Sequence, residues 1–125
     1  MTYAPAVKDA SELSFVQQDK PDAPDLVRCY AQVEPARQLP NLQKMPVLVV
    51  TSEASYHAPY DHCTVKYLRQ AGVKASWIKL ADRGIHGNSH VMMMEKNSKQ
   101  IAEVIIAWAN KSIQGKKPNQ TAAVH

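Results

Sequence analysis

The chain has 125 residues, a formal net charge of +4 and a hydrophobic fraction of 45%, which suits one soluble domain and excludes a second catalytic domain. Its longest apolar run, at 45–50, is too short to cross a membrane, and no secretory signal is visible. Basic residues are scattered, so binding to nucleic acid or to a membrane is not expected. With two cysteines and no CxxC spacing, the sequence predicts neither a disulfide framework nor a zinc finger, and it favours a reducing, cytoplasmic location.

Residues 1–44 are interrupted by proline. Five prolines fall within this segment, and proline removes a backbone donor and breaks helices. The segment is therefore predicted to be a loop-rich arm or cap connection, with short helical stretches at 10–15 and 25–32.

Residues 45–113 follow an α/β pattern. The continuous β-branched and Leu run at 47–51 predicts a central strand buried on both faces. An amphipathic helix is expected at 60–71, ended by Gly72 and lying on the sheet, and a second strand at 73–80. The gap of roughly 20 residues between the strands fits a right-handed parallel crossover. The apolar face of the helix comprises Tyr60, Cys63, Tyr67, Leu68 and Ala71.

A loop at 81–94 leads to a last helix, for which Asn97 and Gln100 predict a capping box. Residues 114–125 are expected to form a flexible tail. The fold class is thus α/β, a parallel βαβα unit. Two strands and two helices cannot enclose both faces of a sheet. We therefore expect that the arm covers one face, that the chain self-associates, or that an N-terminal portion is missing.

The densest polar cluster lies at 84–97, just after the second predicted strand. Ligands of open α/β sheets bind outside the carboxyl ends of the strands, so His86 and His90 are well placed for function. Gly84 and Gly87 allow a tight loop. The alternative is a turn whose histidines are merely solvated.

Three segments, 45–57, 68–73 and 84–97, resemble the C-terminal third of α/β-hydrolase-fold esterases of a bacterial and fungal branch. The most specific part is Gly87-Asn88-Ser89-His90 followed by the methionines at 92–94, which is similar to the Gly-Asn-x-His motif of that family. The resemblance implies that His90 is the general base of a serine ester hydrolase. It implies a small-molecule ester substrate and neither a metal nor an organic cofactor.

The chain departs from this family at the nucleophile and the acid. None of its eight serines lies in a GxSxG motif, which is the strand-to-helix elbow that such enzymes require. Glu53 follows the first predicted strand, where many members carry the acid, but the surrounding residues differ from the usual Gly-x-x-Asp. Glu53 is therefore one candidate acid, Asp61 a weaker one, and an acid upstream of this chain is the alternative. Either residue could also be a plain loop carboxylate or a helix-start anion.

A metal site and a thiol nucleophile are less favoured. The spacings of His57, His62, Cys63, His86 and His90 match no zinc pattern, so no metal site is predicted. Cys63 and His90 could form a thiol nucleophile pair, but Cys63 lies on an apolar helical face, where a buried structural cysteine is the commoner outcome.

The sequence thus predicts the histidine-bearing part of a serine ester hydrolase, inactive in isolation because the nucleophile is absent. The rival hypothesis is a truncated or pseudoenzyme module that acts, if at all, by binding a partner through an uncovered sheet edge.

Overall fold

The computed structural model describes residues 1–115, which form two compact units, one from Met1 to His90 and one that begins at Val91. The first unit is mixed α/β and contains a parallel and an antiparallel pair of strands. The second holds a 3-10 turn at Met92–Met94 and helix α3, Ser98–Gln114. The predicted tail beyond Gly115 lies outside the described residues.

The parallel pair confirms the βαβ prediction. Strand β3, Val47–Thr51, pairs with β4, Ala75–Lys79, and helix α2, Asp61–Gln70, connects them. The register aligns Val47 with Ala75 and Thr51 with Lys79. The prediction that β3 is a central strand buried on both faces is wrong. Within residues 1–115, β3 has β4 as its one partner, and Thr51 is the one buried residue of the strand.

Helix α2 ends where the sequence predicts. Gly72 follows the C-cap Ala71 with φ of 82°, a left-handed conformation that glycine adopts without a steric cost. The N–H groups of Gly72 and Val73 donate to the carbonyls of Arg69 and Leu68 at 3.0 and 2.9 Å, which completes a Schellman motif. A Cβ at Gly72 would also collide with the side chains of Gln38 and Gln43. The turn therefore joins α2 to β4 against the arm.

The arm of residues 1–44 contains strands where helices were expected. Strand β1, Phe15–Gln17, pairs antiparallel with β2, Tyr30–Gln32, so the predicted helix at 25–32 is wrong. The predicted helix at 10–15 is reduced to a 3-10 turn, Ala10–Glu12, and α1 is a single turn at Pro40–Gln43. Isolated helices of this length are marginal in water, and pairing with a distant strand outweighs their local preference.

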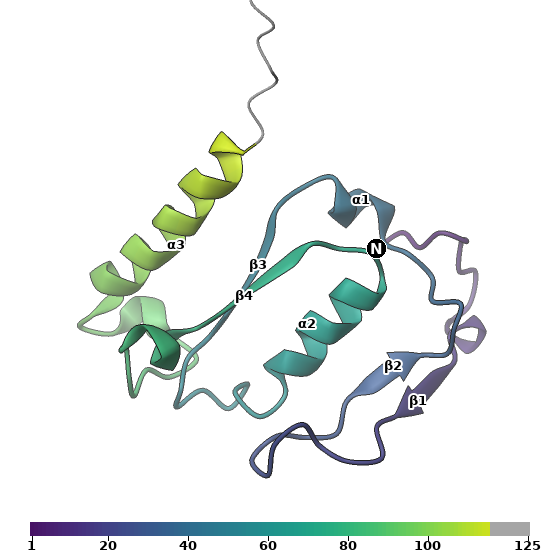
Figure 1. Cartoon of the computed structure of the whole chain (residues 1–125), viewed down its shortest axis with the longest axis horizontal. Coiled ribbons are helices and arrows are strands. Elements are labelled where there is room, and N and C mark those ends of the chain that lie inside the picture. The colour runs from purple at the N-terminus through teal and green to yellow at the C-terminus, as the bar shows by residue number, and fades with distance from the viewer. Residues whose placement is uncertain (116–125) are drawn as a thin grey trace, which may run out of the picture. The chain divides into compact units, whose positions relative to one another are not determined.

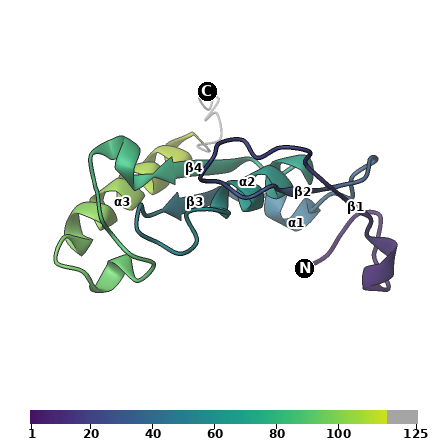
Figure 2. The ribbon, with the colours of Figure 1, turned by 90° about the horizontal axis from the view of Figure 1, so that it is seen from below.

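The arm packs on α2. The Gln70 side chain bonds both the N–H and the carbonyl of Gln32, at 2.8 and 2.9 Å, and the Leu39 side chain is buried in a core with Ala71, Val73 and Ala75. Figure 1 shows α2 between the parallel pair and the antiparallel pair, and the turned view of Figure 2 gives the same order. The apolar face of α2 therefore contacts the arm as well as the sheet.

Tyr67 illustrates this packing. Its hydroxyl lies 2.7 Å from that of Tyr3 in the arm, and its ring centroid lies 6.4 Å from that of Phe15. Burial, and then the hydrogen bond with Tyr3, raise the pKa of Tyr67 to about 12. Sequence analysis expected Tyr67 on the helix face that lies on the sheet. In the structure it contacts the arm, and its phenol stays neutral there.

A disulfide joins the arm to α2. Cys29 and Cys63 are bonded at a sequence separation of 34, so the prediction that the two cysteines form no disulfide framework is wrong. The two cysteines are distant in sequence, and only the packing of the arm on α2 brings them together. The alternative of a thiol nucleophile pair between Cys63 and His90 is also excluded, because the Cys63 sulfur is already bonded.

The second unit contains α3 and the short turn before it. Asn97 is the N-cap residue of α3, but its side chain makes no capping hydrogen bond, so the predicted capping box does not form. In the part of the chain that the structure describes, every helix is too short or too polar to span a membrane.

The disulfide generates a stability prediction. Replacing both cysteines, Cys29→Ser with Cys63→Ser, should lower the free energy of unfolding by about 3–4 kcal/mol, because a cross-link across a loop of this length restricts the unfolded chain. Urea unfolding followed by far-UV circular dichroism measures the change. As a control, a reductant should destabilise the wild-type chain and leave the double variant unaffected. Equal midpoints for the two proteins without reductant would contradict the assignment.

Candidate active site

The loops that follow β3 and β4 lie together at one edge of the parallel pair. Parallel strands in register end on the same side, and the Ala54 N–H in the first loop donates to the Asn88 carbonyl in the second at 3.0 Å. Ser52 and Asn88 are 1% and 2% exposed. The structure therefore brings the Glu53 loop and the His90 loop together.

The second loop is anchored by two apolar residues. A 3-10 turn at Leu80–Arg83 ends at Gly84, whose φ is 73°, and the Ile85 N–H then donates back to the Leu80 carbonyl at 3.0 Å. Leu80 and Ile85 are buried. With its base fixed in this way, the loop presents His86 and His90, both exposed, at the edge of the sheet.

Glu53 contacts this loop through its carboxylate. Oε2 lies 3.2 Å from Nδ1 of His86 and accepts a hydrogen bond of 2.9 Å from the Gly87 N–H. The Gly87 N–H, and then the His86 side chain, lower the pKa of the Glu53 carboxyl below its usual value. The histidine that Glu53 contacts is thus His86, the one without a predicted role.

His90 belongs to a cluster of rings. Its imidazole stacks on that of His57, with centroids 4.3 Å apart and planes at 21°, and its centroid lies 4.8 Å from that of Tyr56. Tyr60 extends the cluster, with its ring centroid 4.9 Å from that of His57. Residues 56–60 come from the loop after β3 and the start of α2, so His90 from the second loop lies against the first.

A buried network supports His57. Asp61, at the start of α2, has one carboxylate oxygen 3.7 Å from Nδ1 of His57, while the other accepts a 2.8 Å hydrogen bond from the Thr51 hydroxyl. The Thr51 oxygen in turn accepts a 2.9 Å hydrogen bond from the Trp77 indole N–H. Strand β3, strand β4 and helix α2 are thereby joined beneath the histidine cluster.

These contacts form two carboxylate–histidine pairs, Glu53 with His86 and Asp61 with His57. Sequence analysis placed Glu53 after the first predicted strand and His90 after the second, but it did not assign a function to His57, which was named only among unmatched metal ligands. The i,i+4 spacing of His57 and Asp61 across a helix start was the available signal. The catalytic roles of His90 and Glu53 stay predictions.

Comparison with known proteins gives one informative relative. A region of 87 residues, 70% of this chain, is 52% identical to the "Probable secreted lipase phiG" of Fungal sp. (strain ATCC 74256). The chain spans 24% of the length of that relative. No family model matches, and no solved structure matches significantly. The similarity establishes a relationship with lipases or esterases for this part of the chain.

The prediction of a cytoplasmic location is wrong. The relative is named as a secreted protein, and the Cys29–Cys63 disulfide is of the kind that persists in oxidising compartments. The cysteine pattern misled because a lack of CxxC spacing says nothing of cysteines that meet only in the folded chain.

The Thr51 network predicts a specific sensitivity. Thr51→Val should lower the free energy of unfolding by about 1–3 kcal/mol, because it leaves the Asp61 carboxylate and the Trp77 N–H without their shared partner. Chemical denaturation measures the change. The matched variant Thr64→Val, at an exposed position of α2, should stay within about 0.5 kcal/mol of wild type. Equal effects of the two variants would contradict the network.

Glu53 predicts a pH dependence. Because its pKa is lower in the folded chain than in the unfolded chain, its contribution to stability is present above the unfolded pKa of about 4.3 and is lost as pH falls through the folded pKa. Glu53→Gln should therefore be less stable than wild type at pH 7, and the two unfolding midpoints should converge toward pH 3. Glu103→Gln, which removes the same charge at an exposed site of α3, controls for net charge. A gap between wild type and Glu53→Gln that widens in acid would refute the prediction.

Proposed function

We propose that the chain is the histidine-bearing C-terminal part of a serine ester hydrolase, in which residues 45–113 belong to the hydrolase domain and residues 1–44 connect to a cap. One observation carries the proposal. His90, within a Gly-Asn-x-His sequence, lies on the loop after β4, at the same edge of the parallel pair as the loop after β3. The similarity to a fungal lipase supports it, and the disulfide supports an exported protein.

His90 acts in this proposal as the general base. It takes the proton of a serine hydroxyl that another part of the protein supplies, the serine attacks the ester carbonyl, and His90 then gives the proton to the departing alcohol. Water repeats the cycle on the acyl-enzyme. No metal or organic cofactor takes part in these steps.

The acid that orients His90 is Glu53 in our proposal. Its hydrogen bonds to His86 and Gly87 keep its carboxylate on the His90 loop, and its side chain is 48% exposed. Catalytic hydrogen bonds are often looser without substrate. Completion of the triad then requires the Glu53 carboxylate to leave His86 and to bond His90. The two histidines are four positions apart on the same loop.

The substrate we propose has an apolar acyl or alcohol group. A cavity of about 630 Å³ lies between the arm and α2, and Tyr60 lines it together with Val27, Leu39 and Leu68. Pockets of this size hold small apolar ligands. Tyr60 also contacts His57 of the ring cluster, so the cavity adjoins the proposed reaction edge.

A second function is favoured by one specific observation. The sequence contains no GxSxG motif, so a catalytically inactive, truncated or pseudoenzyme module that binds a partner is the alternative. Such a module would keep the fold of this region without turnover.

A chimera separates the two functions. The segment of the secreted fungal lipase that corresponds to this chain is replaced by the matching residues of this chain, and hydrolysis of a p-nitrophenyl ester is measured. We expect the chimera to be active and His90→Ala to reduce kcat by about 10⁴-fold or more, because the serine loses its base. The purified 125-residue chain should not hydrolyse the ester faster than free imidazole does.

The matched control is His86→Ala in the same chimera, which should keep kcat within about tenfold. An inactive chimera that is correctly folded would favour the pseudoenzyme module. Equal losses for the His86 and His90 variants would contradict the assignment of the base.

A further inference from the structure

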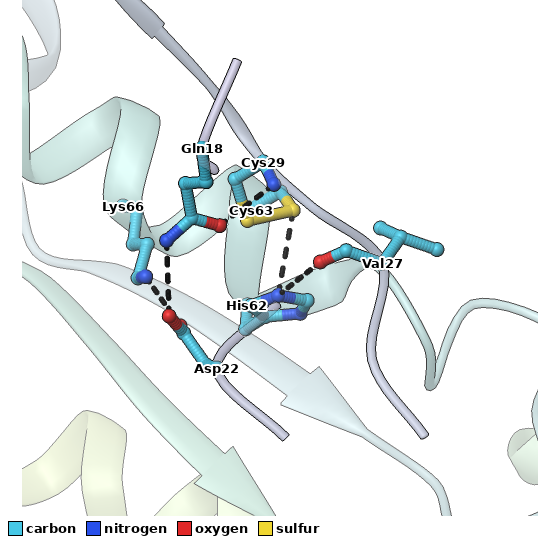
Figure 3. Close-up of a disulfide and its surroundings, with 7 residues drawn as sticks. All are labelled: Gln18, Asp22, Val27, Cys29, His62, Cys63 and Lys66. Atoms are coloured by element: carbon cyan, nitrogen blue, oxygen red, sulfur yellow. Dashed lines mark hydrogen bonds and ion pairs between the residues drawn. A yellow bond between two sulfur atoms is a disulfide. The ribbon is translucent and has the colours of Figure 1, made fainter. Parts of the chain in front are cut away.

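A buried histidine beside the disulfide has no role in ester hydrolysis. His62, on the first turn of α2, is 3% exposed. Its Nε2 lies 3.2 Å from the Val27 carbonyl and 3.5 Å from the Cys63 sulfur (Figure 3). Within residues 1–115, Nδ1 is buried with no hydrogen-bond partner. Nε2 is therefore the ring nitrogen that faces the disulfide.

Three donor atoms converge at this point. The sulfurs of Cys29 and Cys63 and a ring nitrogen of His62 all lie within 4.8 Å of one another. Zinc bonds thiolate sulfur at about 2.3 Å and imidazole nitrogen at about 2.0 Å in tetrahedral sites, so its ligand atoms are separated by roughly 3.3–3.8 Å. Small side-chain movements would therefore bring the three atoms to coordination distance. Two thiolates and an imidazole form a donor set that selects zinc over hard cations such as Mg²⁺.

We propose that, when the disulfide is reduced, Cys29, His62 and Cys63 bind one zinc ion, with water in the fourth position. The two states exclude each other because they use the same sulfur atoms. A phosphine reductant gives two electrons to the S–S bond and becomes a phosphine oxide with oxygen from water, and the sulfurs become two thiols. Zinc then replaces the two thiol protons, which leave to solvent, and His62 exchanges its contact with Val27 for a metal–nitrogen bond.

The surrounding contacts keep the ligands close without the disulfide. Cys29 lies just before β2, and its backbone N–H donates to the Gln18 side chain at 2.8 Å, a hydrogen bond that does not involve the sulfur. Lys66 and Asp22 form an ion pair between α2 and the arm (Figure 3), and Gln70 bonds the backbone of Gln32. These contacts hold the arm on α2 independently of the sulfurs.

Cobalt is the spectroscopic probe for this site. The chain is reduced with a phosphine, freed of reductant without oxygen, and titrated with Co²⁺. We expect the absorption bands of tetrahedral thiolate-bound cobalt to saturate at one equivalent, zinc to displace the cobalt, and both thiols to resist alkylation in the zinc-loaded chain. The oxidised chain and the Cys29→Ser/Cys63→Ser variant should give no such bands.

Histidine variants decide whether the site is specific. His62→Ala should weaken cobalt binding by at least about tenfold, and His86→Ala, remote from the disulfide, should leave it unchanged. Far-UV circular dichroism follows the fold throughout. A reduced chain that is folded but binds no metal, one that unfolds and is not refolded by zinc, or equal binding by His62→Ala and wild type would each overturn the proposal.

Discussion

The in-register pairing of β3 with β4 determines where the residues of the candidate active site lie. Because Thr51 is aligned with Lys79, the two loops that follow meet at one edge and are joined by the Ala54 to Asn88 hydrogen bond. Thr51 also bonds Asp61 and Trp77, so the strand ends and the first turn of α2 are fixed together. A slip of one residue would turn Thr51 to the opposite face and dismantle both the network and the ring cluster above it.

The sequence predicted this part of the fold because its signals are local. A β-branched run, an amphipathic stretch and a glycine stop define β3, α2 and the turn at Gly72, and the topology of a parallel crossover then places the loops. His90 was located in the same way, since its loop follows β4. The partner of Glu53 was not predictable, because the Gly87 N–H and the His86 ring that hold its carboxylate depend on the exact path of an exposed loop.

Sequence analysis did not predict the structure of the arm, because contacts between residues far apart in the sequence organise it. Strands β1 and β2 are only three residues long each, too short for a clear period-two pattern. Their position depends on Gln32 with Gln70 and on Cys29 with Cys63, pairs separated by 38 and 34 positions. The wrong expectations that no disulfide framework forms and that the compartment is reducing have this one cause. Cysteine spacing detects local motifs and not a cross-link between a helix and an arm.

The central claim is that the loops after β3 and β4 share one edge, with His90 stacked on His57. Nuclear Overhauser spectroscopy on the oxidised chain tests it most directly. The account predicts cross-peaks between the ring protons of His57 and His90, whose centroids are 4.3 Å apart, and between those of His90 and Tyr56. Assigned ring resonances without these cross-peaks would contradict the arrangement from which the proposed role of His90 follows.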